Sequence, residues 1–465
     1  MFAGLRGITR AAAVCTLLIH AASGAEPSTP WHTIRTIAVD DSVWHWNWGS
    51  WDQDKIVTFG DYQYTVYWDE DRVFVLARRD LRDDAVQTIR LRQFKLSSDD
   101  THRNTCLGVS AKDGRLHLSW DHHNNPLNYT RSVAGFLTNP PPRISEEDIE
   151  PRQSITADST STSRVTYPLF LHDANGQLFL FFRLGVSGDG ENLLFRYDSA
   201  TGTWARVGRV FSGRGTYAPW QGDKSRNAYF HDVVFDARNR LHVTWVYREA
   251  GSTWASNHDL HYAYSDDGGK TWCNNAGQRI GDMAADDPIE LADPGIVVRE
   301  IPVYSWVMNS GCMAIDSKQR PHVVTFKIPS PRRPLKLEHN PPADIASTLR
   351  FVHYWRDDSG QWLGGSPISA GIESGPPARG DVVFGANDTL YYYYQPKDAK
   401  GGFVCLQASP DDQWQSWRAC PLTGPQISGL DASKHDRSRW RADHILSITA
   451  RSGEQGFAIV DLKLP

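Results

Sequence analysis

The sequence predicts an all-β protein built as a seven-bladed β-propeller. A turn followed by a strand recurs along the chain, and successive copies start about 40 to 80 residues apart, roughly the length of a four-stranded blade. Long amphipathic helix patterns are nearly absent. Seven copies therefore indicate seven blades in one closed domain, and we expect strands from the two ends of the chain to share a blade.

The copies share a polar turn and then a strand rich in apolar residues. They read DEDRVFVLA from Asp69, KDGRLHLSW from Lys112, DANGQLFLFF from Asp173, DARNRLHVTW from Asp236, DSKQRPHVVTF from Asp316, GANDTLYYYY from Gly385 and SGEQGFAIVDLKL from Ser452. Polar turn residues that bound β-prone segments are typical of hairpins. Each copy therefore predicts a turn and the strand that follows it, and most copies are followed by a second strand.

A further strand of the fourth copy ends in SDDGGKTW, from Ser265 to Trp272. This is an Asp-box turn, in which Asp caps backbone amides, Gly takes a positive φ and Trp covers the hairpin. The Asp-box occurs on propellers of many activities. By itself it predicts the fold and says little about the function.

Composition and charge exclude some classes of partner. The chain has 465 residues, is 40% hydrophobic and 22% charged, and carries a formal net charge of −5. Acidic and basic residues are mixed and no basic run occurs, which argues against nucleic acid as a partner. An acidic substrate would therefore need a local basic pocket. The 18 tryptophans suit sheet packing and sugar stacking alike.

The N-terminus predicts a secretory signal peptide over residues 1–25. Arg6 and Arg10 precede an apolar stretch at residues 11–22, and small residues follow. No segment reaches the roughly 20 apolar residues that a membrane span needs. We therefore expect residues 26–465 to form a single catalytic propeller domain of a secreted or periplasmic protein, active as a monomer.

The densest group of chemically capable residues lies in the second and third predicted blades. Asp100-Thr101-His102-Arg103-Asn104 enters one strand, and LHLSWDHHNNPLNY follows from Leu116. His122, His123 and Asn124 come directly after a strand, where propeller loops face a funnel. A neutral imidazole accepts a proton near neutral pH. Capping a turn or filling a polar core is the alternative role for such histidines.

Tyr167, in VTYPLF, and Arg183, in FFRLGVSGDG, follow in the next blade. Tyr167 precedes a proline, which favours an extended backbone that presents the ring at a strand end. Arg183 ends a very apolar run, where an unpaired guanidinium would be costly. We expect it to have an anionic partner, either a structural Asp or a substrate carboxylate. Arg248 ends a strand in the same manner, facing either an acidic sugar or a salt bridge between blades.

These sequences resemble those of propeller-type polysaccharide lyases with BNR or Asp-box repeats, among them ulvan lyases and rhamnose–glucuronate lyases. The resemblance rests on the D-x-H entry at Asp100, DGRLHLSWDHH, TYPLF and FFRLGVSG, which all lie between Asp100 and Gly190. One departure is Arg103, which separates His102 from Asn104. The resemblance implies a lyase that cleaves a uronic-acid-containing polysaccharide by β-elimination.

The resemblance also implies a role for each residue. Arg183 would pair with the uronate carboxylate, which makes the C5 proton more acidic and stabilises the developing enolate. His102 and Tyr167 would exchange the roles of base and acid, while His122 would hold the carboxylate or assist proton transfer. Further substrate contacts are expected from His123, Asn124 and Arg248. No cofactor is required for this chemistry.

A structural zinc or calcium ion is a separate expectation. Imidazole and thiolate ligands that suit zinc are offered by His231, His242, His258, His261, Cys273 and His322. His242 and His322, however, fall at the repeat position of His117, which favours a role in building the blades. The metal and its ligands stay open at this point.

Two other functional classes fit the same fold. A rhamnosidase-like glycoside hydrolase would need two suitably spaced carboxylates, and the chain has many Asp and Glu residues. A non-catalytic carbohydrate-binding propeller would keep its aromatic rings and Arg183 but tolerate the loss of Tyr167 or His102.

Overall fold

The computed structural model describes residues 30–47, 54–251, 253–368, 379–395, 404–424, 428–430 and 434–464. The signal peptide expected over residues 1–25 lies outside them. Strands dominate the described residues, and the α-helices found there are the short α1 (Ala343–Ala346) and α2 (Arg437–Asp443). None of the helices in this part of the chain is long and apolar enough to cross a bilayer.

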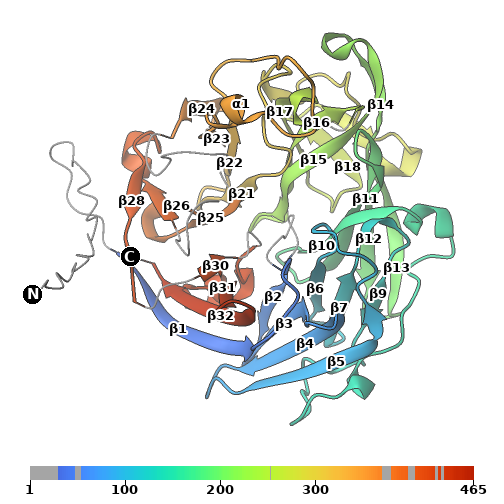
Figure 1. Ribbon diagram of the computed structural model, residues 1–465. Coiled ribbons are helices and arrows are strands. Elements are labelled where there is room, and N and C mark those ends of the chain that lie inside the picture. Colours follow the sequence, from blue (N-terminus) through green and yellow to red (C-terminus); the bar gives the residue numbers. More distant parts are fainter. Residues whose placement is uncertain are drawn as a thin grey trace, which may run out of the picture.

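Within the described residues the strands form seven sheets, which stand in a ring as in a propeller (Figure 1). The first contains β2 (Ile56–Phe59), β3 (Tyr62–Trp68), β4 (Val73–Asp80) and β5 (Val86–Lys95). The second contains β6 (Thr105–Ser110), β7 (Arg115–Trp120) and β9 (Tyr129–Arg131). The third contains β8 (His123–Asn125), β10 (Val165–His172), β11 (Leu178–Val186), β12 (Asp189–Asp198) and β13 (Thr203–Phe211).

The fourth sheet contains β14 (Arg214–Tyr217), β15 (Asp223–Phe235), β16 (Leu241–Glu249), β17 (Asn257–Ser265), β18 (Thr271–Asn274), β19 (Arg279–Asp282) and β20 (Val297–Arg299). The fifth contains β21 (Cys312–Ile315), β22 (Pro321–Lys327), β23 (Arg350–Arg356) and β24 (Trp362–Pro367). The sixth contains β25 (Gly380–Phe384), β26 (Leu390–Tyr394), β27 (Val404–Ala408) and β28 (Arg418–Cys420). The last contains β1 (Trp31–Asp40), β29 (Leu422–Thr423), β30 (Ser428–Leu430), β31 (Ile445–Ser452) and β32 (Gly456–Lys463).

Each sequence repeat forms the turn and the second strand of one hairpin, and every hairpin lies in a different sheet. The hairpins are β3–β4, β6–β7, β10–β11, β15–β16, β21–β22, β25–β26 and β31–β32. At the turn of β15–β16, Asp236 Oδ1 accepts hydrogen bonds from the amides of Arg238 and Arg240, each at 2.8 Å. The carboxylate thus takes the place of a backbone acceptor and fixes the turn. The repeat prediction is confirmed.

Two of the repeat histidines also build their blades. His242 Nε2 lies 3.4 Å from the second carboxylate oxygen of Asp236, and His322 Nε2 lies 3.4 Å from that of Asp316. Both side chains are buried. These imidazoles therefore tie a strand to the turn that precedes it, as their repeat position indicates.

The first and last long strands close the ring. β1 pairs antiparallel with β32, for example Ile37 with Ile459, and the two lie side by side in Figure 1. The expectation that both ends of the chain share a sheet is confirmed. The seam is tied to the first sheet by a buried ion pair between Arg79 and Asp461 at 2.9 Å.

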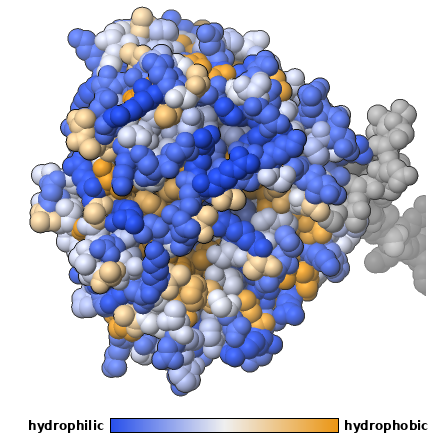
Figure 2. All heavy atoms as spheres, turned by 180° about the vertical axis from the view of Figure 1, so that it is seen from behind, coloured by the Kyte–Doolittle hydropathy of each residue, from blue (hydrophilic) through white to orange (hydrophobic). Residues whose placement is uncertain are grey.

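Other local predictions can be placed in the structure. In the Asp-box turn, Asp267 Oδ1 accepts from the amides of Lys270 and Thr271 at 3.0 and 2.9 Å, and Trp272 is buried over the hairpin. Cys405 and Cys420 lie opposite each other in β27 and β28, and no disulfide joins these two residues. Hydrophilic residues cover most of the face seen in Figure 2, with apolar residues in scattered patches.

Candidate active site

The candidate site begins where the chain passes from the second sheet to the third. β7 ends at Trp120, Asp121 takes a left-handed conformation with φ 62°, and β8 then pairs with β10, His123 opposite Thr166. Successive side chains of an extended segment point to opposite sides. The two consecutive histidines, His122 and His123, therefore have different surroundings.

His122 points into the blade. Its side chain is fully buried, and its Nε2 lies 3.0 Å from Ser119 Oγ and 3.2 Å from the amide of Asn128. Burial lowers the pKa of His122 to about 3, so the ring is neutral. Its Nδ1 has no hydrogen-bond partner among the described residues.

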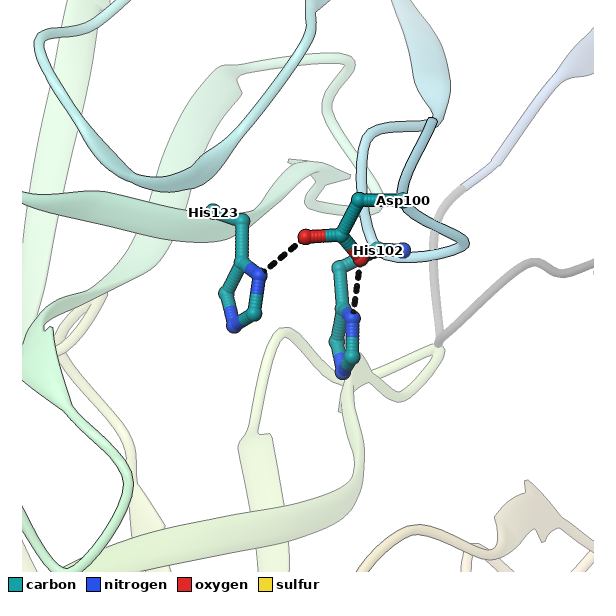
Figure 3. A group of neighbouring side chains, drawn as sticks. All are labelled: Asp100, His102 and His123. Atoms are coloured by element: carbon teal, nitrogen blue, oxygen red, sulfur yellow. Dashed lines mark hydrogen bonds and ion pairs between the residues drawn. The ribbon is translucent and has the colours of Figure 1, made fainter. Parts of the chain in front are cut away.

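His123 instead forms a pair with His102. Their rings are stacked with centroids 4.1 Å apart, and both Nδ1 atoms face the carboxylate of Asp100 (Figure 3). Asp100 Oδ1 lies 2.7 Å from His102 Nδ1, and Oδ2 hydrogen-bonds His123 Nδ1. Because a carboxylate accepts, the ring protons belong on Nδ1, and both Nε2 atoms are left with lone pairs.

The protonation of this group follows from its surroundings. Burial lowers the pKa of His102, and the hydrogen bond from its ring to Asp100 only partly opposes this effect. Burial would raise the pKa of Asp100, but the hydrogen bonds from the two histidines hold it below its usual range. At neutral pH the group therefore has an ionised Asp100 and a neutral His102.

Tyr167 lies beside this pair in a strained conformation. Its φ is 57°, so the backbone is left-handed and the extended conformation predicted from the following proline is wrong. The pairing of β10 with β11 shifts register between Thr166 and Leu169, which gives Tyr167 room to leave the pleat. Its ring centroid is 6.1 Å from that of His102. Such strain is concentrated at functional sites.

Two arginines flank the same space. Arg183 Cζ lies 4.9 Å from the ring centroid of Tyr167, and Arg183 donates to Tyr229 Oη at 3.1 Å and to Thr166 Oγ1 at 3.0 Å. Arg248 donates to Asn257 Oδ1 at 2.8 Å and to Ser187 Oγ at 3.3 Å.

Both guanidinium groups are buried, and Arg183 Nε and Arg248 Nη2 have no hydrogen-bond partner among the described residues. Within the same part of the chain, no carboxylate forms an ion pair with either. The expected structural Asp beside Arg183 and the salt bridge between blades at Arg248 are therefore not found there. An anion bound between the two arginines would satisfy both.

Tyr229 is a site residue that sequence reasoning missed. Its hydroxyl donates to Ser187 Oγ at 3.0 Å and accepts from Arg183, and Arg248 Cζ lies 4.5 Å from its ring centroid. Burial would raise the pKa of Tyr229, but the charges of Arg248 and Arg183 lower it to about 8. Burial and the nearby Tyr229 raise the pKa of Tyr167 above its usual range. Of the two neighbouring phenols, Tyr229 is therefore the more acidic.

Asn124 supports the site from behind. Its backbone N–H donates to Thr166 Oγ1 at 2.9 Å, which is the same oxygen that accepts from Arg183, and its side-chain Oδ1 accepts from Arg164. The partly exposed Asn124 therefore stands at the rim, one hydrogen bond away from Arg183.

Two groups of side chains have the spacing of a metal site. In Asp100, His102 and His123 both Nδ1 atoms are engaged by the carboxylate, and we interpret this group as a pair of oriented bases. The second group is His258, Asp259 and His261. Of the other histidines and the cysteine expected to bind metal, none belongs to such a group within the described residues.

Comparison with known proteins adds to this geometry. A family model described as "BNR repeat-containing family member" matches residues 62–365. The ulvan lyase long isoform of Pseudoalteromonas sp. (strain PLSV) is 22% identical over 260 residues, which cover 49% of this chain and 26% of that protein. The chain thus matches about a quarter of that relative's length. The ulvan lyase short isoform of Alteromonas sp. (strain LOR) is 21% identical over 71% of both chains.

Solved structures agree in fold. The polysaccharide lyase Uly1 superimposes with a TM-score of 0.65 at 16% identity, covering 89% of this chain and 90% of that one. A PL25 ulvan lyase bound to a -[GlcA(1-4)Rha3S]- saccharide superimposes with a TM-score of 0.63 at 14% identity, covering 91% and 95%.

Proposed function

The chain belongs to the BNR repeat-containing family, and on this premise we propose that it is a polysaccharide lyase that cleaves a uronate-containing glycan of the ulvan or rhamnose–glucuronate type by β-elimination. The relatives named above as ulvan lyases support the substrate class. A saccharide of glucuronate and sulfated rhamnose is bound to one structure of similar fold.

The observation that carries this proposal is the pair of buried arginines for which the described residues provide no anionic partner. Arg183 and Arg248 share the hydroxyl of Tyr229, and each has an N–H group without a hydrogen-bond partner among the described residues. Buried guanidinium groups are costly unless an anion pairs with them. A planar uronate carboxylate matches their forked donors, and its binding there would place the C5–H bond beside Tyr167 and the histidine pair.

The elimination needs one base and one acid. The base removes the C5 proton, the C5–H electron pair forms the C4–C5 double bond, and the C4–O bond breaks with its electrons leaving on oxygen. That oxygen then takes a proton from the acid. Arginine pairing stabilises the enolate that develops on the carboxylate during the first step.

We assign the base role to His102 and the acid role to Tyr167. His102 is neutral, and because its Nδ1 donates to Asp100, the lone pair that can accept a proton lies on Nε2. Tyr167 keeps its proton because burial raises its pKa, so it is suited to protonate the leaving oxygen. His123 shares Asp100 and would contact the sugar or assist the transfer, a role first expected of His122.

A hydrolase mechanism finds less support. Inverting and retaining glycosidases use two carboxyl groups that flank the scissile bond. The carboxyl group that lies at the histidine pair is that of Asp100. Both of its oxygens accept hydrogen bonds from histidines, so it is occupied in a way that a glycosidase acid or nucleophile would not be.

The test is ultraviolet absorbance during incubation with ulvan and with rhamnose–glucuronate-capped arabinogalactan. We expect absorbance from the unsaturated uronate to rise with the wild-type chain and to stay flat with Tyr167→Phe and His102→Ala. Release of reducing sugar without this absorbance would identify a hydrolase. Binding of either polymer without cleavage would identify a carbohydrate-binding propeller.

Three further features belong to the same proposal. We propose that each of the seven sheets is one blade, so that residues 26–465 form one seven-bladed domain. Residues 1–25 would direct the protein to the periplasm or outside the cell, where polysaccharide is met. The enzyme would act as a monomer, which light scattering on the purified protein tests directly.

A further inference from the structure

A second cluster of unusual side chains lies on β17, at the end of the strand pair that carries Arg248. The pairing of β16 with β17 shifts register there, so that one residue separates Trp245 from Tyr247 while two separate His261 from His258. This is a β-bulge, and Asp259 within it has φ 53°. The bulge brings together side chains that a regular strand would place on opposite faces.

One ligand atom from each of His258, Asp259 and His261 lies within 4.8 Å of those of the other two. Both imidazoles are fully buried, and the Asp259 side chain is 15% exposed. Tyr217 stacks on His258 with ring centroids 3.8 Å apart and covers it. The cluster is therefore almost entirely shielded from solvent.

Each of the three side chains is oriented by a partner outside the cluster. His258 Nε2 faces Glu249 Oε1 at 3.0 Å, and Glu249 is held by two hydrogen bonds from the buried Arg226. His261 Nδ1 faces the carbonyl of Trp245 at 3.3 Å.

The carboxylate is oriented in the same way, because Asp259 Oδ1 accepts from the amide of Ile301 at 2.8 Å. A carboxylate or carbonyl on the far side of each imidazole is the usual outer shell of a metal-bound histidine.

These partners leave three electron-pair donors facing one another. With its proton on Nε2 toward Glu249, His258 turns the lone pair of Nδ1 toward Asp259 Oδ2, 2.9 Å away. His261, with its proton on Nδ1, has its buried Nε2 without a hydrogen-bond partner in the described part of the chain. A positive charge must lie between Nδ1 and Oδ2. A single proton can bridge those two atoms, but it leaves His261 Nε2 unsatisfied, whereas a metal ion satisfies all three.

We propose that His258, Asp259 and His261 bind a divalent transition-metal ion, with zinc as the best match. Two imidazole nitrogens and one carboxylate oxygen are ligands that zinc prefers, and calcium or magnesium would require oxygen ligands instead. Three protein ligands leave a fourth position for water. Only part of the histidine and cysteine set expected from the sequence contributes, and the carboxylate was not expected.

The ion would help to fix the position of Arg248, the proposed carboxylate-binding residue. Glu249 follows Arg248 directly in β16, and Asn257, which accepts from Arg248 Nε at 2.8 Å, precedes His258 directly in β17. Arg248 therefore has the outer-shell residue Glu249 next to it in β16, and its partner in β17 is next to the metal ligand His258. This link rests on the proposed function, whereas the metal site itself does not.

The test measures metal content in the full chain purified without a polyhistidine tag. After incubation with zinc and removal of free metal, we expect about one zinc ion per wild-type chain by elemental mass spectrometry. Replacing zinc with Co²⁺ should give the visible absorption of a four-coordinate site. Asp259→Asn is the most informative variant. The new carboxamide can still accept from the amide of Ile301 and can donate to His258 Nδ1, so residues 258 and 259 are hydrogen-bonded to each other without a metal ion.

The matched control is His242→Gln, which removes a buried histidine that builds a blade. Zinc retained by this control and lost by a folded Asp259→Asn chain, with circular dichroism like the wild type, supports the site. Equal zinc in Asp259→Asn and wild type, or no zinc in either after incubation, overturns it. Because metal content is independent of the lyase assay, a chain that binds zinc but cleaves no polysaccharide would refute only the proposed function.

Discussion

The rings of His102 and His123 stack at a centroid distance of 4.1 Å and share the single carboxylate of Asp100. His102 comes from the loop before β6, while His123 lies in β8, which belongs to the next sheet. One aspartate therefore fixes the orientation and the tautomer of two imidazoles from neighbouring sheets. The first prediction concerns this shared carboxylate.

Asp100→Asn should lower kcat by about 10- to 100-fold while KM changes little, because the rings lose their orientation but the arginines remain. The Asp100 hydrogen bond raises the pKa of His102 against the effect of burial. Its loss lowers that pKa further, so the acidic limb of the kcat/KM profile should move to lower pH. The neighbouring variant Asp99→Asn should leave the profile unchanged. An unshifted limb in Asp100→Asn would remove His102 from the role of base.

Arg183→Lys should lower kcat/KM on a uronate polymer by about 100-fold or more, although the charge is kept, because a lysine cannot pair with a carboxylate through two parallel hydrogen bonds. Initial rates of double-bond formation measure this. The matched control is Arg240→Lys, since Arg240 pairs with Asp266 at the surface. Equal losses in both variants would contradict a specific role for Arg183.

Tyr229 should ionise at a lower pH than the other tyrosines. The nearby guanidinium groups of Arg248 and Arg183 lower its pKa to about 8 against the opposing effect of burial. Phenolate absorbance should therefore show one early step as pH rises, which Tyr229→Phe abolishes. Arg248→Gln removes one of the two charges and should move the step to higher pH. A wild-type titration without a step below the ordinary tyrosine range would refute this assignment.

Asp54→Asn should stabilise the protein at pH 7.5 and not at pH 4. Burial raises the pKa of Asp54 to about 6, so the folded state binds this proton more tightly than the unfolded state does. Stability from this group is therefore lost as pH rises from about 4 to 6. The neutral amide avoids a loss of up to about 3 kcal/mol in the free energy of unfolding. Denaturant unfolding at both pH values measures it, and a lower stability of the variant at pH 7.5 would contradict the sign.

Asp267→Ala should destabilise the fold by about 1–2 kcal/mol without changing activity per folded molecule. Its carboxylate accepts from the amides of Lys270 and Thr271 in the Asp-box turn, and within the described residues it forms no hydrogen bond or ion pair with the proposed catalytic residues. Thermal unfolding together with kcat measures both effects. A loss of kcat at a temperature where the variant is folded would connect the Asp-box turn to the site.

The sequence repeats predict the sheets well because each repeat carries its own turn chemistry. Asp236 fixes its hairpin with hydrogen bonds to residues two and four positions ahead, so the signal is local. The same holds for the entry at Asp100, whose partner His102 is two positions away. Motifs of this kind can be recognised in the sequence without knowledge of the tertiary structure.

The rest of the site depends on contacts between sheets, which no local pattern records. Tyr229 lies in a strand of buried residues, so its sequence position predicts an ordinary core aromatic. Only the tertiary structure shows that Arg183 of the neighbouring sheet donates to its hydroxyl. The choice between His122 and His123 depends on which of these two side chains, at the start of β8, faces Asp100. Alternation along an extended segment separates the two side chains, but only the pairing with β10 decides their directions.

The pairing of β1 with β32 has a consequence for how the molecule is made. It joins segments separated by nearly the whole length of the chain, so it is the closure with the largest entropy cost. A growing chain can assemble the sheets of the proposed catalytic group while β1 still has an unpaired edge. Such an edge recruits other strands. Until β32 has been synthesised and pairs with β1, the nascent protein can aggregate through the unpaired edge of β1. Once the ring is closed, the buried ion pair between Arg79 and Asp461 stabilises the closure.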